Sequence, residues 1–87
     1  MKRPTLEKTR KSRKARTAPF QQAYDALLEG LITARREANL TQRDVSTLMG
    51  RSHTFLSKCE SGERSLDVME LLQLANIYKK PVNHFLR

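Results

Sequence analysis

The sequence predicts an all-α fold: a compact domain of five helices over residues 20–87, preceded by a basic, flexible N-terminal arm over residues 1–19. Three observations lead to this prediction. After Pro19, apolar residues recur every three or four positions, no segment alternates in the manner of a β-strand, and residues able to start or end a helix separate the apolar segments. With 87 residues, 38% of them hydrophobic, the chain can form one small core.

The predicted arm carries nearly all of the net charge. The chain has a formal net charge of +8, and residues 1–19 hold eight basic residues and one acidic residue, a net of +7. This segment has too few apolar side chains to offset the entropy lost on ordering, so we expect it to be flexible by itself. Basic arms often bind nucleic acid, so the candidate DNA contacts in the arm are Arg10, Arg13, Lys14 and Arg16. A solubilising tail is the alternative, and a transit peptide is a third and weaker one.

The first predicted helix covers residues 20–38. Gly30 inside it costs about 1 kcal/mol relative to alanine. Asn39 can end the helix in a left-handed conformation. The apolar face of this helix consists of Phe20, Ala23, Tyr24, Leu27, Leu28, Leu31, Ala34 and Ala38.

The second predicted helix covers residues 42–49 and the third covers residues 53–61. Thr41 and Ser52 are suitable N-caps for them, and Asp44 would lie favourably in the first turn of the second helix. A glycine follows each helix and can end it. The core candidates of these two helices are Val45, Leu48, Met49, Leu56 and Cys59.

The fourth predicted helix covers residues 68–78, because Asp67 and Glu70 have the spacing of a capping box. A final short turn begins at Pro81. The apolar residues of these last two elements are Val68, Leu71, Leu72, Ala75 and Ile77, followed by Val82, Phe85 and Leu86.

Residues 41–61 have the spacing of a helix-turn-helix. Counting from Gln42, Gly50 falls at the ninth position, where the turn needs a residue that tolerates positive φ. Ser46, at the fifth position, is small enough to let the two helices approach. Leu56 and Cys59 supply apolar groups at the fifteenth and eighteenth positions, which would seat the third helix against the others.

The stretch from Leu40 to Leu86 resembles the lambda-repressor-like helix-turn-helix family, the Cro and phage-repressor type of regulator, also called XRE-like. The basic arm lies outside this resemblance. Two departures, Ser46 for the usual alanine and Cys59 for a larger apolar residue, lead us to expect looser packing around the third helix. The matching segments are Leu40–Gln42, Gly50, Ser52, Leu56–Lys58, Glu60–Arg64 and the apolar helix Asp67–Ile77.

In a helix-turn-helix, the N-terminal part of the third helix lies in the major groove while the second helix crosses the DNA backbone. With Leu56 and Cys59 facing inward, the opposite face of that helix points outward. Phe55 lies on the flank, where it could pack on the second helix or touch a thymine methyl group. The candidate base-reading residues are Ser52, His53, Thr54, Ser57 and Lys58.

The resemblance also implies contacts to phosphate and one structural ion pair. It places phosphate contacts at Thr41 and Gln42, where the second helix begins. Ser61 and Arg64, on either side of the Gly62 turn, would hold a second phosphate. Finally, it pairs Arg35 with Glu60, locking the first helix to the third; the alternative is two solvated charges.

We therefore expect a sequence-specific, double-stranded DNA-binding transcriptional regulator in the cytoplasm, and specifically a repressor that binds an inverted-repeat operator as a homodimer. Val82, Phe85 and Leu86 are the candidate dimer contacts, unless they only cap the core. Two alternatives remain open: an antitoxin or protein-binding adaptor with the same fold, and an RNA-binding protein driven by the arm. Few exposed aromatics argue against the latter.

Several classes of function lack support in the sequence. The longest apolar run has three residues, Ala26–Leu28, far short of the roughly 20 that a membrane span needs. One cysteine and two histidines without ligand spacing predict no metal site. We find no nucleophile–base pair, no phosphate-binding glycine loop and no sign of a small-molecule ligand, so we expect neither an enzyme nor a cofactor.

Overall fold

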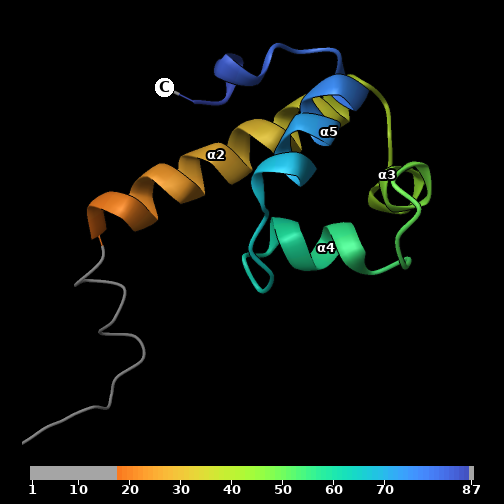
Figure 1. The fold of residues 1–87 in the computed structure, drawn as a ribbon, viewed down its shortest axis with the longest axis horizontal. Coiled ribbons are helices and arrows are strands. Elements are labelled where there is room, and N and C mark those ends of the chain that lie inside the picture. The colour runs from red at the N-terminus through yellow and green to blue at the C-terminus, as the bar shows by residue number, and fades with distance from the viewer. Residues whose placement is uncertain (1–17, 87) are drawn as a thin grey trace, which may run out of the picture.

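The computed structural model describes residues 18–86, which form four α-helices and one 3₁₀ turn (Figure 1). No strand occurs in this range, as predicted. The fifth predicted helix is only a single 3₁₀ turn, which follows Pro81. The elements are α2 (Ala18–Glu37), α3 (Gln42–Leu48), α4 (Phe55–Glu60), α5 (Val68–Tyr78) and η2 (Val82–His84).

Helix α2 begins within the segment predicted as the arm, since it includes Ala18 and Pro19. Proline is tolerated in the first turn of a helix, where its missing N–H would have no partner. The rest of the predicted arm, including Arg10, Arg13, Lys14 and Arg16, lies outside the described residues.

The ends of the helices follow the predicted signals closely. Asn39 has φ 60°, as expected for a residue that terminates α2. Thr41 caps α3: its hydroxyl accepts the Asp44 N–H at 3.0 Å, and the Asp44 carboxylate accepts the Thr41 N–H at 2.9 Å. Hydrogen bonding by Thr41 holds the pKa of Asp44 below its usual value. Asp67 and Glu70 form the predicted capping box at the start of α5.

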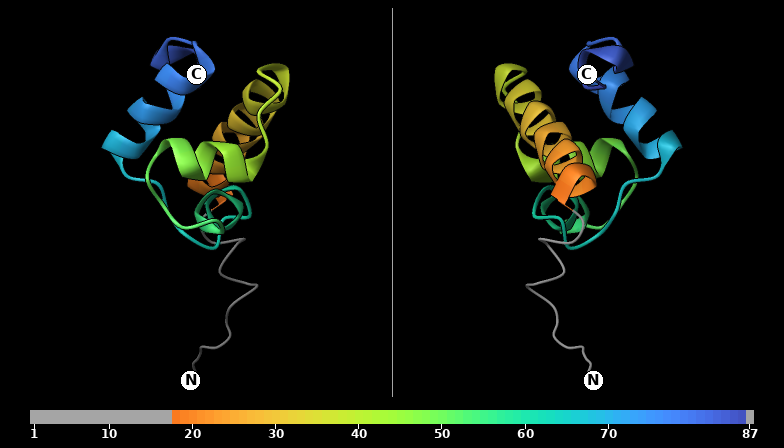
Figure 2. Two further views of the ribbon diagram at one scale, coloured as in Figure 1. Left: turned by 90° about the vertical axis from the view of Figure 1, so that its right-hand side faces the viewer. Right: turned by 90° about the vertical axis from the view of Figure 1, so that its left-hand side faces the viewer.

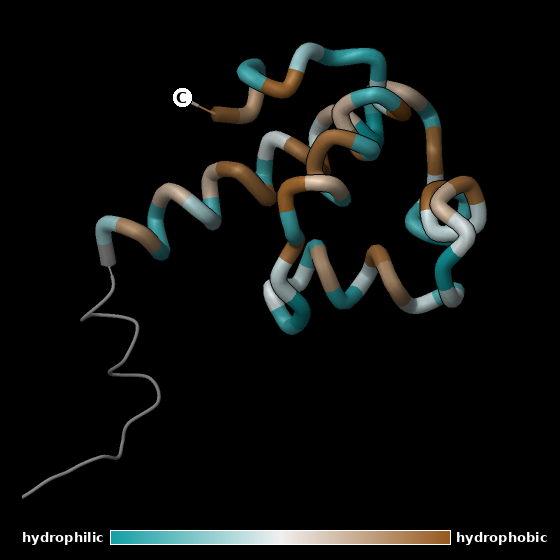
Figure 3. The backbone as a smooth tube through the Cα atoms, in the orientation of Figure 1, coloured by the Kyte–Doolittle hydropathy of each residue, from teal (hydrophilic) through white to brown (hydrophobic). Residues whose placement is uncertain are grey.

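The core draws buried side chains from α2, α3, α4 and α5 and from Phe85, and Figure 3 shows apolar stretches on each of these helices. Leu31, Leu56 and Leu74 are nearly inaccessible, each with at most 2% of its surface exposed. Phe85 packs against Gly30 of α2: a Cβ at Gly30 would lie 3.4 Å from Phe85 Cδ1, an ordinary van der Waals contact.

Several of the predicted apolar positions are exposed. Phe20, Leu48, Val68 and Leu72 are 82%, 62%, 71% and 41% exposed, and Ala23 and Ala38 are exposed as well. Helix α5 is apolar at most of its positions, so periodicity alone could not select the face that packs inward. That face consists of Glu70, Leu74, Ala75 and Tyr78.

Helix α4 lies at the lower edge of the helical body in Figure 1, with α3 beside it and α2 and α5 above it, and Figure 2 shows the same order from the side. It packs against α3 and α2, while α5 packs against α2 and η2. One long side of α4 is therefore left for solvent or for a partner.

Candidate nucleic-acid interface

Helix α4, the predicted reading helix, begins two residues later than the sequence suggested. Thr54, and not Ser52, occupies the N-cap position, and no side chain caps the helix from that position. Ser52 instead accepts the Phe55 N–H with its backbone carbonyl at 3.0 Å, closing a turn over His53 and Thr54. The N–H of Leu56, the second residue of α4, is capped from α3: the Ser46 hydroxyl accepts it at 3.1 Å.

The inward face of α4 is tightly packed. Phe55, Leu56 and Cys59 are 4%, 1% and 0% exposed, and Ser46 is likewise 0% exposed. The expectation of looser packing around this helix is therefore wrong, because the serine hydroxyl is used and the cysteine fits. Burial raises the pKa of the Cys59 thiol, so the group stays protonated and acts as a small apolar side chain.

The five candidate base-reading residues lie together on the outward side of this segment. Ser52, His53, Thr54 and Lys58 are exposed, and Ser57 is half-buried. The Ser57 hydroxyl donates to the Thr54 carbonyl at 3.0 Å, which leaves its oxygen lone pairs as acceptors. The segment thus presents ammonium, imidazole and hydroxyl groups on one surface.

Phe55 does not belong to that surface. It is buried, and two guanidinium groups lie against its ring, with Arg51 Cζ 4.2 Å and Arg64 Cζ 5.0 Å from the ring centroid. The packing alternative for Phe55 therefore holds, and contact with a thymine methyl group does not.

The Arg35–Glu60 ion pair forms between α2 and α4. Arg35 Nε lies 2.8 Å from Glu60 Oε2, with side chains 11% and 6% exposed. A second bond joins Nη2 to Oε1 at 3.2 Å, and Nη1 donates to the Leu40 carbonyl at 2.9 Å. This pair fixes α4 and the loop after α2 in one arrangement.

Two of the four candidate phosphate contacts have their side chains engaged within the protein. Gln42 Nε2 donates to Glu60 Oε1 at 2.7 Å. Arg64 binds Glu70 through two nitrogens, at 2.8 and 3.0 Å. Thr41 and Ser61 are exposed, although both hydroxyls take part in local turn or cap bonds.

Sequence reasoning missed Arg51 altogether. Its Nη1 lies 3.0 Å from Glu70 Oε2, so Glu70 holds two arginines. Glu70 had been assigned only the role of closing a capping box. The sequence does show Arg51 and Arg64 on either side of a helix that carries Phe55. Their common partner, Glu70, is 19 residues from Arg51 along the chain, so local spacing does not indicate the contact.

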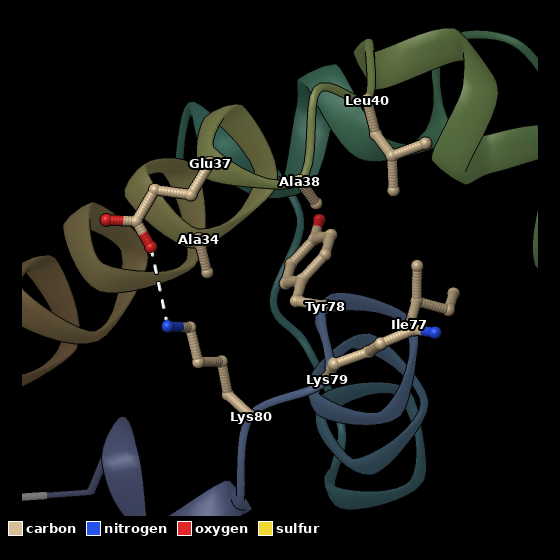
Figure 4. Close-up of a pocket in the computed structure, with 8 residues that line it drawn as sticks. All are labelled: Ala34, Glu37, Ala38, Leu40, Ile77, Tyr78, Lys79 and Lys80. Carbon is tan, nitrogen blue, oxygen red and sulfur yellow. Dashed lines mark ion pairs between the residues drawn. The ribbon is translucent and has the colours of Figure 1, made fainter.

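A pocket lies away from this surface, between the C-terminal ends of α2 and α5 (Figure 4). It measures about 470 Å³, and an ion pair of 3.4 Å between Lys80 and Glu37 spans it. The Tyr78 hydroxyl has no hydrogen-bond partner in the structure, but the oxygen is shielded from solvent. The polar groups that line the pocket are therefore the charged side chains of Glu37, Lys79 and Lys80 and not the Tyr78 hydroxyl.

Two other properties of the described residues bear on function. They contain no group of three or more histidine, cysteine or acidic side chains that could hold a metal ion. Within the same range, no helix has the length and apolar character needed to cross a membrane.

Comparison with known proteins agrees with this geometry. Residues 10–83 match a family model described as a helix-turn-helix domain. The chain belongs to this family of DNA-binding domains, whose members are typically not enzymes. No match was found among curated proteins or solved structures. The match starts at residue 10 and so extends into the predicted arm.

Proposed function

We propose that this protein is a sequence-specific transcriptional regulator of the lambda-repressor-like type, a cytoplasmic repressor that reads double-stranded DNA with α4 and the residues before it. One observation carries the proposal. The polar residues at 52–54 lie in the turn before α4 and those at 57 and 58 lie on the helix, and all of them are at least partly exposed, whereas the inward face of α4 is buried. A helix held this rigidly can place several side chains against base edges at once.

The chemistry of these side chains suits base reading. Lys58 can donate to O6 or N7 of guanine, and Thr54 offers a hydroxyl and a methyl group, the latter suited to thymine. His53, at the turn before α4, can donate or accept. Ser52 adds a hydroxyl that can donate or accept, and Ser57 adds one that can accept, since its proton is donated to the Thr54 carbonyl.

Contacts to phosphate would supply affinity with little sequence information. Thr41 and Ser61 are our candidates among the described residues, together with Arg10, Arg13, Lys14 and Arg16 of the N-terminal segment. Gln42 and Arg64 are weaker candidates than the sequence implied, because Glu60 and Glu70 already hold their side chains.

A single α4 offers few base contacts, so selective binding favours a homodimer on an inverted repeat. The three residues expected at the dimer contact differ in how far they are exposed. Phe85 is only 8% exposed and packs on α2, Val82 is half-buried, and Leu86 is 55% exposed. Leu86 is therefore the member of this set best placed to meet a second copy.

Selection of bound sites from random duplex DNA with the full chain tests the proposal. We expect an enriched half-site repeated with two-fold symmetry. In the Lys58→Ala variant, preference should relax at one base pair per half-site by roughly 1–3 kcal/mol. Lys79→Ala, an exposed lysine at the far end of α5, is the matched control. Failure to enrich any duplex, with binding to single-stranded RNA or to a protein instead, would contradict the proposal.

A further inference from the structure

Glu70 is a buried carboxylate that binds groups from both ends of α4. Its side chain is 6% exposed. Its Oε1 accepts from Arg64 Nη1 at 2.8 Å and from the Asp67 N–H at 3.0 Å. Its Oε2 accepts from Arg64 Nη2 and from Arg51 Nη1, both at 3.0 Å. Arg51 lies in the turn before α4 and Arg64 lies in the loop after it, so one carboxylate ties both flanks of this helix to α5.

The two arginines are held in place and are also close to solvent. Their guanidinium groups lie against the ring of Phe55, and their side chains are 37% and 38% exposed. Glu70 neutralises one of the two positive charges and occupies three of the guanidinium N–H groups. Without this carboxylate, Arg51 would keep only its stacking on Phe55, and Arg64 would keep that stacking and its bond to the Ser65 carbonyl at 3.0 Å, so both charges would be unpaired at the flanks of α4.

We propose that Glu70 determines sequence discrimination, as a positioning residue: it withholds Arg51 and Arg64 from DNA phosphates and fixes the orientation of α4. This inference rests on the proposed function. Arginines that reach phosphates add affinity for every sequence alike, which raises non-specific binding. A carboxylate that keeps them occupied makes affinity depend more on base contacts.

The Glu70→Gln variant tests this role. Glutamine has nearly the same size and can complete a capping box, so the start of α5 is preserved, but the charge that holds the arginines is lost. Binding of the full chain to the selected site and to random duplex is measured over a series of salt concentrations. We expect tighter binding to random duplex at low salt, a steeper salt dependence by about 0.9 for each phosphate gained, and a lower ratio of specific to non-specific affinity.

Glu63→Gln is the matched control, because Glu63 is exposed and lies in the same loop as Arg64. It makes the same change in net charge but releases no arginine. Equal salt slopes and equal discrimination in the two variants would overturn the proposal. So would a Glu70→Gln variant that weakens binding to both kinds of duplex by the same factor, which is the result expected for loss of structure alone.

Arg51→Gln provides an independent test if Glu70→Gln does not fold, because Glu70 keeps both bonds to Arg64. We expect lower discrimination with an unchanged salt slope, since Arg51 contacts no phosphate in the wild-type protein. A salt slope that is smaller by about 0.9 in Arg51→Gln would show that Arg51 contacts a phosphate in the wild-type protein, and would overturn the proposal. If the wild-type chain binds no duplex, both the proposed function and the role of Glu70 are contradicted. If the wild-type chain selects a site but Glu70→Gln behaves like Glu63→Gln, only the role of Glu70 is contradicted.

Discussion

The hydroxyl of Ser46, in the middle of α3, accepts the backbone N–H of Leu56 at 3.1 Å. Leu56 is the second residue of α4, and the first N–H groups of a helix have no acceptor within that helix. Both residues are fully buried, so water cannot take the place of the serine. One helix of the pair thus caps the other, which fixes where α4 begins.

Ser46→Ala should therefore destabilise the domain by about 1–3 kcal/mol, because it leaves a buried N–H without a partner. The free energy of unfolding in denaturant measures this loss. Thr47→Ala is the control, since Thr47 is exposed at the next position and its substitution should change stability by no more than about 0.5 kcal/mol. Equal effects of the two substitutions would show that the hydrogen bond contributes nothing.

Arg35→Ala should cost on the order of 3 kcal/mol, because it leaves the Glu60 carboxylate buried without its cationic partner. In a domain of this size such a loss is a large part of the total stability. Arg36→Ala, an exposed neighbour, is the control. A double-mutant cycle between Arg35 and Glu60 isolates the pair itself, and a coupling energy near zero would contradict its role.

The sequence predicts helix ends better than helix faces. Thr41, Gly50, Asp67 and Asn39 act locally, through caps and backbone conformations that depend on a few neighbouring residues, and the structure agrees with each of them. Ser52 has the same local signal, but α4 begins only at Phe55, and the hydroxyl of Ser46 from α3 binds the N–H of its second residue, Leu56. Competition from a residue in another helix cannot be read from local spacing.

The buried contacts of the candidate site join residues from different segments of the chain, and such contacts cannot be predicted from local signals. The Arg35–Glu60 pair followed from a family resemblance, whereas the contact of Glu70 with Arg51 and Arg64 had no precedent in the motif. Glutamate at the third position of a helix is already explained by capping. Its second role appears only when the turn before α4 and the loop after it are brought together in space.

Acid should weaken the domain through Glu70. Hydrogen bonds from Arg64 lower the pKa of Glu70 from 4.5 to about 2. A lowered pKa in the folded state gives stability that is fully present above pH 4.5 and is lost as the pH falls toward 2. The loss amounts to at most about 3 kcal/mol, since one pKa unit corresponds to about 1.4 kcal/mol.

The unfolding free energy measured between pH 7 and pH 2 tests this prediction. Glu70→Gln should show a shallower fall in stability with acid than the wild-type protein. The fall should not vanish, because the lowered pKa of Asp44 acts in the same direction. Identical pH profiles for Glu70→Gln and wild type would contradict the assignment.

Tyr78→Phe should stabilise the domain by about 1 kcal/mol, because it removes a buried hydroxyl that has no hydrogen-bond partner. Tyr24→Phe makes the same chemical change but should destabilise the domain, because the Tyr24 hydroxyl accepts the Leu66 N–H at 3.2 Å. Thermal and denaturant unfolding of the two variants should thus differ in sign. Destabilisation by both would show that the Tyr78 hydroxyl has a partner in solution.

The N-terminal segment should supply much of the affinity for DNA and little of the sequence preference. Residues 1–17 hold eight basic residues and one acidic residue, and therefore seven of the eight net charges of the chain. Each phosphate that these residues neutralise should add about 0.9 to the slope of log K against log salt. Deleting residues 1–17 should flatten this slope and weaken binding most at low salt.

Two truncations separate the parts of this segment. Residues 1–9 carry a net charge of +2 and lie outside the helix-turn-helix match, whereas residues 10–17 carry +5 and lie within it. Deletion of residues 1–9 is compared with deletion of residues 1–17. If both parts bind phosphate in proportion to their charge, the first deletion should lower the salt slope, and the further loss of residues 10–17 should lower it by more than twice as much again. The base preference found by site selection should stay the same in both truncations, because α4 is intact, and circular dichroism should report the same helical fold. An unchanged salt slope after removal of all 17 residues would show that the segment does not contact DNA.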